Sequence, residues 1–266
     1  MNPPGTGTHA VDDHHVDPPI DTSLAHPARV YDYLLGGKDN WPADRDVGER
    51  IMGLVPSARD EALANRAFLR RSVRYAAERG VDQFLDIGTG IPTVGPTHAT
   101  AHAIRPDARI LYVDNDPIVL THARALLVDD ELTHVLRADV RQPETILDHP
   151  EIGRLDLSRP VALMFVGLLY FITEAQLNGL LERYAAALAP GSLLLITHVL
   201  DTPEVEAAKA IYKTTAPLVP RSRRGIEALF AGWDLVEPGV VPIHDWRPDG
   251  DGPRAGHLLG GVAVKP

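Results

Sequence analysis

The residues that most constrain the fold of this chain are an apolar segment at 84–87 and the glycine turn that directly follows it. A short apolar run bounded by turn residues is typical of a strand buried on both faces of a sheet. Gly88 and Gly90 can adopt positive φ and let a ligand approach the backbone closely. A second such run, at 110–113, ends in Asp114. This order predicts two neighbouring parallel strands with a nucleoside-containing small molecule across their carboxyl ends.

The glycine turn also distinguishes between classes of nucleotide ligand. A dinucleotide site needs the pattern G-x-G-x-x-G, in which the third glycine allows close packing beside a pyrophosphate. Thr93 occupies that third position. The sequence therefore disfavours NAD or FAD and favours a cofactor without phosphates. The segment 92–104 is predicted to be a helix that begins at Pro92 and points its free N–H groups toward the ligand.

Strand and helix patterns alternate regularly from residue 81 onward. Strands are predicted near 83–87, 109–113, 133–138, 161–166 and 192–198, with helices between them that are clearest at 117–127 and 173–188. Two closing strands, at 233–241 and 257–264, are predicted to complete the sheet. The expected fold class is therefore α/β, with a mostly parallel seven-stranded sheet that is covered by helices on both faces.

The part of the chain before the sheet has a different character. Residues 1–22 have almost no large apolar side chains and are expected to form a flexible leader. Residues 23–80 contain three helix patterns and are expected to form an N-terminal helical segment packed on the core at 81–266. Arg66, Arg70 and Arg74 follow an i, i+4 row on the longest of these helices, and we interpret that row as a solvated face rather than an anion site.

Composition limits the classes of partner. The net charge is −10, which disfavours tight sequence-independent binding to nucleic acid. The chain has no cysteine, so disulfides, a thiolate nucleophile and cysteine-ligated metals are excluded. No compact group of histidines and acids has metal-ligand spacing, so no metal is predicted. The chain has no apolar stretch of membrane-spanning length and no secretory signal pattern, so we expect a cytoplasmic protein without a membrane partner.

Three of these elements together resemble the class I S-adenosylmethionine-dependent methyltransferases. They are the turn at 86–90, the acid Asp114, and a third strand-end acid, Asp139. The resemblance implies a Rossmann-like fold, in which the turn holds the methionine end of S-adenosylmethionine, Asp114 holds the ribose and Asp139 meets the adenine amino group. The cofactor-binding residues that it implies are Asp86, Gly88, Thr89, Gly90, Asp114, Asn115, Asp139, Val140 and Val166.

A closer resemblance covers roughly residues 25–264. The segments PARVYDYLLGGKDN at 27–40, NRAFL at 65–69, YVDNDP at 112–117 and LVEPGVV at 235–241 look like the signature of an actinobacterial S-adenosylmethionine-dependent methyltransferase family, long described only as a domain of unknown function. This resemblance supplies a fold and a cofactor, but it does not supply a substrate.

The candidates for catalysis and acceptor binding lie around the expected cleft. His198 ends the fifth strand and can serve as a base near neutral pH, or it is a strand-end histidine bonded to a backbone carbonyl. Tyr31, a second catalytic candidate, can form an apolar lid together with Tyr33 and Trp41, or these rings pack the N-terminal helices onto the sheet. The candidate substrate-binding residues are Tyr33, Asn40, Trp41 and Tyr170.

We therefore predict an S-adenosylmethionine-dependent methyltransferase that acts on oxygen or nitrogen of a small organic acceptor. The fourth strand lacks the acid or amide found at its end in relatives that methylate nucleobase or glutamine nitrogens, so those acceptors are less favoured. Two alternatives remain from the sequence. One is an S-adenosylmethionine-binding protein without catalysis, such as a sensor, and the other is a nucleotide-dependent oxidoreductase, which Thr93 disfavours.

Overall fold

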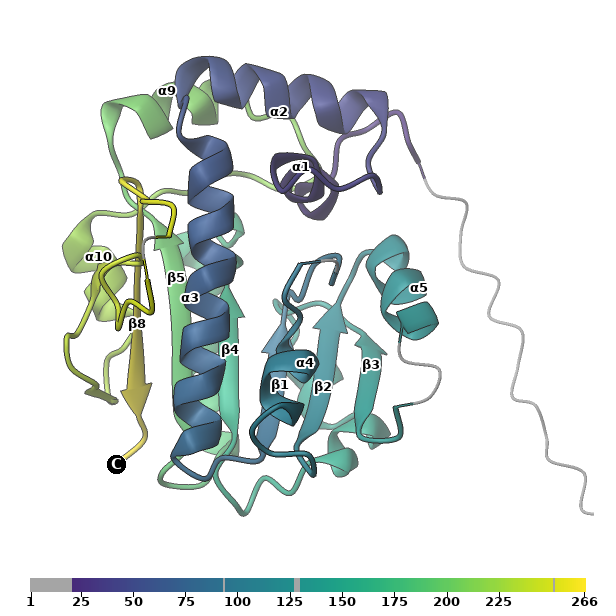
Figure 1. The fold of residues 1–266 in the computed structure, drawn as a ribbon, viewed down its shortest axis with the longest axis vertical. Helices are drawn as coiled ribbons and strands as arrows, with labels where there is room; N and C mark the ends of the chain where they lie inside the picture. The colour runs from purple at the N-terminus through teal and green to yellow at the C-terminus, as the bar shows by residue number, and fades with distance from the viewer. Residues whose placement is uncertain (1–20, 93, 127–129, 251) are drawn as a thin grey trace, which may run out of the picture.

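An eight-stranded sheet forms the centre of the protein in its computed structural model (Figure 1). The structure describes residues 21–92, 94–126, 130–250 and 252–266, so nearly all of the expected leader at 1–22 lies outside the described residues. The strands are β1 (Gln83–Ile87), β2 (Arg109–Asp114), β3 (Thr133–Arg137), β4 (Ala162–Val166), β5 (Leu193–Val199), β6 (Asp234–Leu235), β7 (Val241–Pro242) and β8 (Leu258–Val264).

The strand order places a natural ligand site at the centre of the sheet. The order is β3-β2-β1-β4-β5-β8-β6, with β7 also paired to β8. Strands β1 to β5 are parallel, and β8 is antiparallel to β5. The chain moves outward from β1 to β3 and then returns to the other side of β1 with β4. Ligands of open α/β sheets bind at the carboxyl ends of the strands where the order reverses in this way.

The seven-stranded prediction is wrong by one strand, because the segment 233–241 forms two short strands. β6 and β7 each pair two residues with β8. Between them, Gly239 has a φ of 82° and its N–H donates to Val236 O at 2.8 Å, which closes a turn. Pro238 has no N–H to give to a ladder. The β-branched residues on either side favour a strand, but the Pro–Gly pair interrupts it.

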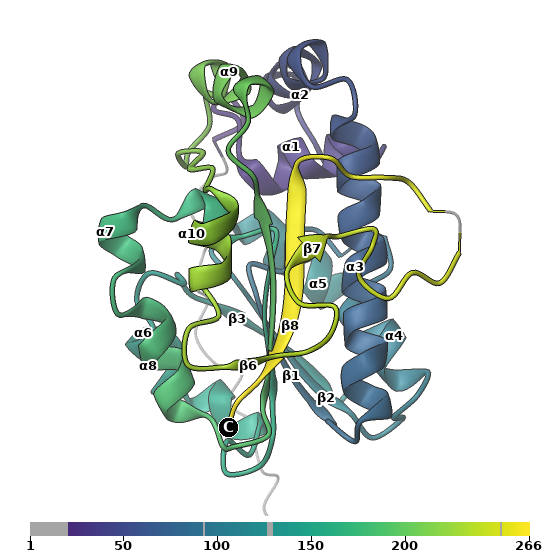
Figure 2. The same cartoon turned by 90° about the vertical axis from the view of Figure 1, so that its left-hand side faces the viewer.

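Helices cover both faces of the sheet, as predicted (Figure 2). Helices α3 and α4 lie on one face, and α6, α8 and α10 lie on the other. The bounds are α1 (Pro27–Leu34), α2 (Pro42–Leu54), α3 (Ala58–Glu78), α4 (Thr97–His102), α5 (Pro117–Leu126), α6 (Glu144–Leu147), α7 (Glu174–Leu177), α8 (Leu180–Ala187), α9 (Pro203–Ile211) and α10 (Arg223–Ala228), with 3₁₀ turns η1 (Pro150–Arg154) and η2 (Leu169–Phe171).

The core is divided between the two faces by the alternation of side chains along each strand. Phe84 belongs to the cluster that includes Phe68 and Val73 of α3. Its neighbour Leu85 belongs to the opposite cluster, together with Tyr184 of α8. Successive strand residues point to opposite faces, so a strand that is apolar throughout is buried by helices on both sides.

The N-terminal helices lie where the parallel strands end. Figure 1 shows α1, α2 and α9 together beyond the carboxyl ends of β1, β2 and β4, while α3 runs down one face of the sheet. Apolar side chains of α1, α3 and α9 share one cluster, which includes Leu34, Ala62 and Ala208. The N-terminal segment is therefore a cover over the edge of the sheet at which a ligand is expected.

Candidate functional site

A cavity of about 640 Å³ lies between the carboxyl ends of β1, β2 and β4 and the N-terminal helices. Its volume is within the range of roughly 300–1,000 Å³ that is typical of small-molecule sites. One end is lined by the glycine turn and by the ends of β2 and β3. The other end, which we call the distal chamber, is lined by residues of α1, α2, α3, η2 and α9 and by the residue before β8.

The glycine turn has the backbone conformation that its sequence predicts. Gly88 and Gly90 have φ values of 71° and 64°, and both line the cavity. A Cβ atom on Gly88 would lie 2.6 Å from Leu168 Cδ1, so no larger residue fits there without displacing Leu168. The turn thus combines positive φ with a close approach to the loop after β4, and it leaves its backbone open to a ligand.

Asp114 lies at the end of β2 with its carboxylate held by two backbone groups. Its Oδ2 accepts a hydrogen bond from Gly90 N–H at 3.0 Å, and its Oδ1 accepts one from Asp116 N–H at 3.0 Å. Burial raises the pKa of Asp114, while these two bonds act in the opposite direction. Because each carboxylate oxygen can accept more than one bond, Asp114 can still accept from a vicinal diol in the cavity that it lines.

Asp139 and Val140 follow β3 and line the same end of the cavity. The Asp139 carboxylate accepts from Arg141 Nε at 2.8 Å and also contacts Nη2 of that guanidinium. Burial acts against ionisation, but the bonds from Arg141 outweigh it and hold the pKa of Asp139 below its ordinary value. Asn115, Thr89 and Val166 also line the cavity.

Asp86 is the one predicted cofactor residue that does not line the cavity. Its Oδ2 accepts from Thr97 Oγ1 at 2.6 Å, at the start of α4, and the next residue, His98, donates its N–H to Tyr112 Oη at 2.9 Å. Helix α4 begins at Thr97 and not at Pro92, because Gly95, with a φ of 55°, and Pro96 delay it. No residue of α4 lines the cavity, so the expectation that this helix points its free N–H groups at the ligand is wrong.

Replacing Asp86 by asparagine is expected to stabilise the protein more at about pH 7.5 than at about pH 4.5. Burial raises the pKa of Asp86 from 3.8 to about 6. Below pH 3.8 the carboxyl group is protonated in both the folded and the unfolded chain, and the stability of the folded protein is then fully present. As the pH rises through about 6 the buried group must ionise, and this stability is lost. Thermal melting at several pH values checks this. A gain in Tm that does not grow with pH, or that also appears in the exposed variant Asp107→Asn, would contradict it.

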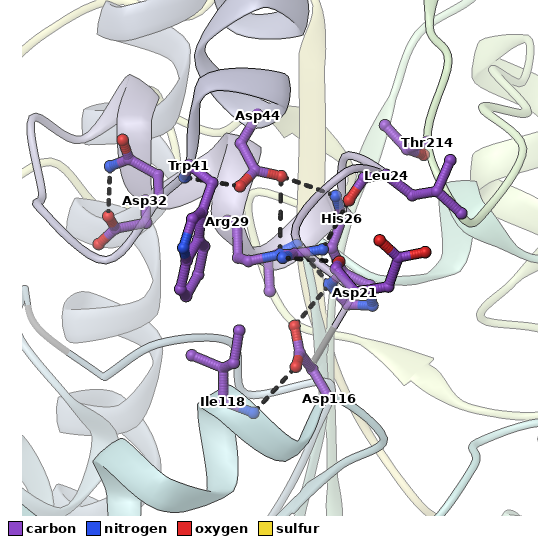
Figure 3. Close-up of polar contacts among 12 residues, drawn as sticks. Asp21, Leu24, His26, Arg29, Asp32, Trp41, Asp44, Asp116, Ile118 and Thr214 are labelled. Carbon is purple, nitrogen blue, oxygen red and sulfur yellow. Dashed lines mark hydrogen bonds and ion pairs between the residues drawn. The ribbon is translucent and has the colours of Figure 1, made fainter. Parts of the chain in front are cut away.

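The N-terminal cover is attached to the loop after β2 at Asp116 by a chain of polar groups (Figure 3). His26 Nδ1 lies 2.9 Å from Asp116 Oδ2, and the N–H of His26 donates to Asp44 Oδ1 at 2.9 Å. Arg29, with Nε 3.6 Å from that same Asp44 oxygen, donates to Leu24 O at 2.8 Å. The start of α1 is thus linked to the loop after β2 on one side and to α2 on the other.

The residues that the sequence predicts to bind the methyl acceptor, together with the catalytic candidate Tyr31, fall into two groups. Tyr31 and Tyr170 line the cavity, whereas Tyr33, Asn40 and Trp41 do not. The Tyr33 hydroxyl bonds to Glu49, and Asn40 Nδ2 donates to Asp32 Oδ2 at 2.9 Å. Trp41 packs in a cluster with Ile91, Ile118 and Val119, and its ring lies under the Arg29 guanidinium. For Tyr33, Asn40 and Trp41, the geometry favours a role in holding the N-terminal helices.

Tyr31 has both hydrogen-bonding functions of its hydroxyl engaged. The hydroxyl donates to Ala62 O at 3.0 Å and accepts from Asn65 Nδ2 at 3.0 Å. Burial raises the pKa of Tyr31, which keeps the phenol protonated. The Asn65 Oδ1 atom is buried without a partner in this structure, and Asn65 lines the cavity. The geometry therefore gives Asn65, rather than Tyr31, the free acceptor.

His198 does not face the cleft, contrary to the expectation from its position at the end of β5. It is fully buried and is absent from the cavity lining. Its Nδ1 bonds to Val199 O at 2.9 Å, and its Nε2 lies 2.6 Å from Arg221 Nη1. Burial lowers the pKa of His198 to about 4. A neutral ring with both nitrogens engaged fits the alternative of a structural histidine, so we propose no catalytic role for it.

The distal chamber contains a histidine–glutamate pair that the sequence did not indicate. Glu61 Oε1 accepts from His257 Nδ1 at 3.0 Å and from the backbone N–H groups of His257 at 3.0 Å and Gly256 at 2.7 Å. In the neutral ring this contact requires the proton on Nδ1, which makes Nε2, 3.9 Å from Glu204 Oε2, the acceptor atom. No local motif connects α3 with the residue before β8, so only the fold brings these two side chains together.

The rest of the distal chamber is mostly apolar. Its walls include four aromatic rings, and aliphatic side chains of the helical cover fill the space between them. These residues are Tyr31, Leu34, Ile51, Val55, Tyr170, Phe171, Val205, Ala208, Tyr212 and Leu218. Within the part of the chain that the structure describes, no three His, Cys, Asp or Glu side chains are grouped to hold a metal, and no helix has the length and apolarity needed to cross a membrane.

Comparison with known proteins agrees with this geometry. A family profile described as S-adenosyl methyltransferase matches residues 13–266. A Thermobifida fusca protein designated a methyltransferase is 43% identical, with a TM-score of 0.88 and coverage of 92% of this chain and 96% of its own. A DUF574 family protein of Streptomyces avermitilis is 39% identical, with a TM-score of 0.87 and coverage of 92% and 99%. A search of curated proteins gave no match.

A more distant likeness concerns the fold alone. Human N-acetylserotonin methyltransferase, solved in complex with S-adenosylmethionine, is 16% identical and has a TM-score of 0.50, with coverage of 83% of this chain and 57% of its own. Together with the family profile, this likeness confirms the predicted Rossmann-like class I architecture.

Proposed function

Because this chain belongs to the S-adenosyl methyltransferase family, we propose that it methylates a small organic acceptor held in the distal chamber. The family makes the chain an S-adenosylmethionine-dependent methyltransferase, which removes the oxidoreductase alternative and establishes the cofactor. The observation that carries the proposal for the acceptor is that one cavity joins the glycine turn and Asp114 to the apolar distal chamber.

The residues at the turn end of the cavity fit S-adenosylmethionine. Gly88 and Gly90 line the cavity, and no atom outside the adjacent residues lies within 4 Å of the position that a Cβ on Gly90 would take, so the turn backbone is open to the methionine part of the cofactor. We assign the ribose hydroxyls to Asp114, whose carboxylate is fixed by the N–H groups of Gly90 and Asp116. We assign the adenine to the wall formed by Asp139 and Val140. The cofactor supplies the electrophilic methyl group, and the protein aligns it with the acceptor.

The lining of the distal chamber indicates the class of acceptor. Its aromatic and aliphatic walls favour a small, largely apolar molecule, and Asn65 Oδ1 offers it one hydrogen-bond acceptor. The overall charge of −10 is unfavourable for nucleic acid. An apolar molecule with one hydroxyl or amine group matches this chamber, and either oxygen or nitrogen can receive the methyl group.

We assign the role of proton acceptor to His257. Methylation of a hydroxyl or an ammonium group requires the loss of a proton, and a positioned side chain can remove it. Glu61 holds the His257 ring by its Nδ1–H, so Nε2 remains as the basic atom of a residue that lines the chamber. The N-terminal segment at 23–80 thus contributes to the proposed chemistry through Glu61 and Asn65, and α1 covers the site.

Isotope transfer tests this function directly. Purified protein is incubated with methyl-labelled S-adenosylmethionine and small-molecule extracts of several actinobacteria, and the products are separated by mass. We expect the label in an apolar product of low molecular mass. Label that appears only in protein or nucleic acid would contradict the proposed acceptor class, and cofactor binding without any labelled product would favour the sensor alternative.

A further inference from the structure

We infer that Arg66 binds the carboxylate of the methionine part of S-adenosylmethionine, an inference that rests on the proposed function. Arg66 comes from the first half of α3 and lines the cavity. Its Nη2 reaches Ile91 O, directly after the glycine turn, at 3.4 Å. The guanidinium therefore lies at the end of the cavity to which the methionine part is assigned, and not in the distal chamber.

Arg66 differs from every other buried arginine among the described residues. Four arginines are at most 9% exposed, namely Arg29, Arg66, Arg71 and Arg221. Each of the other three donates to two backbone carbonyls and lies within 4.0 Å of a carboxylate. Arg66 has one hydrogen bond, to Ile91 O, and no carboxylate within 4.0 Å among the described residues. The Nε atoms of Arg66 and Arg29 are both buried without a hydrogen-bond partner, but that of Arg29 lies 3.6 Å from Asp44.

A buried guanidinium that lacks an anion is unfavourable, because the charge has lost its water without gaining a partner. One candidate within the protein is Asp86, where burial raises the pKa and the charge of Arg66 acts in the opposite direction. Asp86 nevertheless does not lie within the 4.0 Å of an ion pair with Arg66, and its Oδ2 accepts from Thr97 instead. The site therefore contains a cation whose missing partner must come from a ligand.

A carboxylate is the partner that this geometry favours. Guanidinium and carboxylate groups form paired, charge-assisted hydrogen bonds, and such bonds are stronger than those between neutral groups. The cavity has the matching arrangement of charge, with Arg66 beside the glycine turn and Asp114 at the end of β2. A molecule that carries a carboxylate at one end and a ribose further along satisfies both side chains at once.

Calorimetry with two nucleosides tests the inference without any acceptor. S-adenosylhomocysteine carries the amino-acid carboxylate, whereas 5′-deoxy-5′-methylthioadenosine has the same adenine, ribose and thioether without it. Arg66→Met should weaken S-adenosylhomocysteine binding by about 100-fold, since each lost charge-assisted bond costs roughly tenfold. Binding of methylthioadenosine should change by less than about threefold, which also shows that the variant is folded. Arg66→Lys should keep part of the affinity.

The control is Arg70→Met, one turn further along α3. Arg70 is exposed and pairs with Asp249, and it should affect neither ligand. If Arg66→Met weakens both ligands equally, Arg66 supports the pocket and does not bind the carboxylate. If it weakens neither, the carboxylate is held elsewhere or Arg66 serves an acidic acceptor, and the inference is overturned. Failure of both nucleosides to bind the wild-type protein would instead overturn the proposed function, and this inference with it.

Discussion

Asp114→Ala is expected to weaken the binding of S-adenosylhomocysteine by at least about 100-fold, the largest effect on affinity that we predict for a single side chain. The substitution removes the proposed bonds to both ribose hydroxyls, and charge-assisted bonds of this kind contribute roughly 1.5–3 kcal/mol each. It also removes the acceptors of the Gly90 and Asp116 N–H groups, which hold the glycine turn beside the end of β2. Isothermal titration calorimetry measures the change in dissociation constant.

Two further variants separate the ribose contact from a loss of structure. Asp114→Asn keeps the size of the side chain and one acceptor oxygen, so we expect an intermediate loss of affinity. Asp107→Ala removes an exposed carboxylate just before the opposite end of β2 and should leave the affinity unchanged. A normal dissociation constant for folded Asp114→Ala would show that the ribose is held by other groups.

His257→Gln is expected to lower the rate of methyl transfer by about 100- to 1,000-fold while the affinity for S-adenosylhomocysteine stays the same. General bases contribute rate factors of roughly 10²–10⁴. The rate is measured with labelled S-adenosylmethionine and the extract fraction that yields product with the wild-type protein. Glu61→Gln should give a smaller loss, because the ring remains but is no longer oriented by a carboxylate.

The pH dependence distinguishes a base from a structural histidine. If His257 takes up the proton, the fall in rate toward acidic pH should disappear in His257→Gln. The control is His134→Gln in β3, whose side chain is as exposed as that of His257 and also lies 3.9 Å from a carboxylate oxygen, but not in the cavity. Equal losses in both variants, or a loss of nucleoside affinity in His257→Gln, would show that His257 is not the base.

The turn end of the cavity could be predicted from the sequence because its residues belong to local patterns. Each strand, its glycine turn and its terminal acid are continuous segments, and parallel pairing brings the strand ends together without further information. Gly88, Gly90, Asp114 and Asp139 all line the cavity for this reason. Asp86 belongs to the same motif, but alternation along β1 directs its side chain to Thr97 instead.

The distal chamber could not be predicted, because its polar residues come from opposite parts of the chain. Glu61 and His257 are joined only after α3 packs on the sheet and β8 pairs with β5. At the turn end of the cavity, Arg66 is the exception that the sequence does not reveal. It shares an i, i+4 row with Arg70 and Arg74, yet positions four apart drift around an α-helix by about 40°. Arg70 and Arg74 are largely exposed, with 45% side-chain exposure each, whereas this drift leaves Arg66 buried against the cavity.

The contact between α3 and the start of β8 also bears on how the enzyme matures in the cell. Glu61 lies early in the chain, but its partner is reached only after all the parallel strands have been synthesised. The β8 strand that follows His257 pairs along the whole of β5, so the final element of the sheet also brings in the proposed base. Completion of the sheet and assembly of the Glu61–His257 pair are therefore one event in the folding of this enzyme.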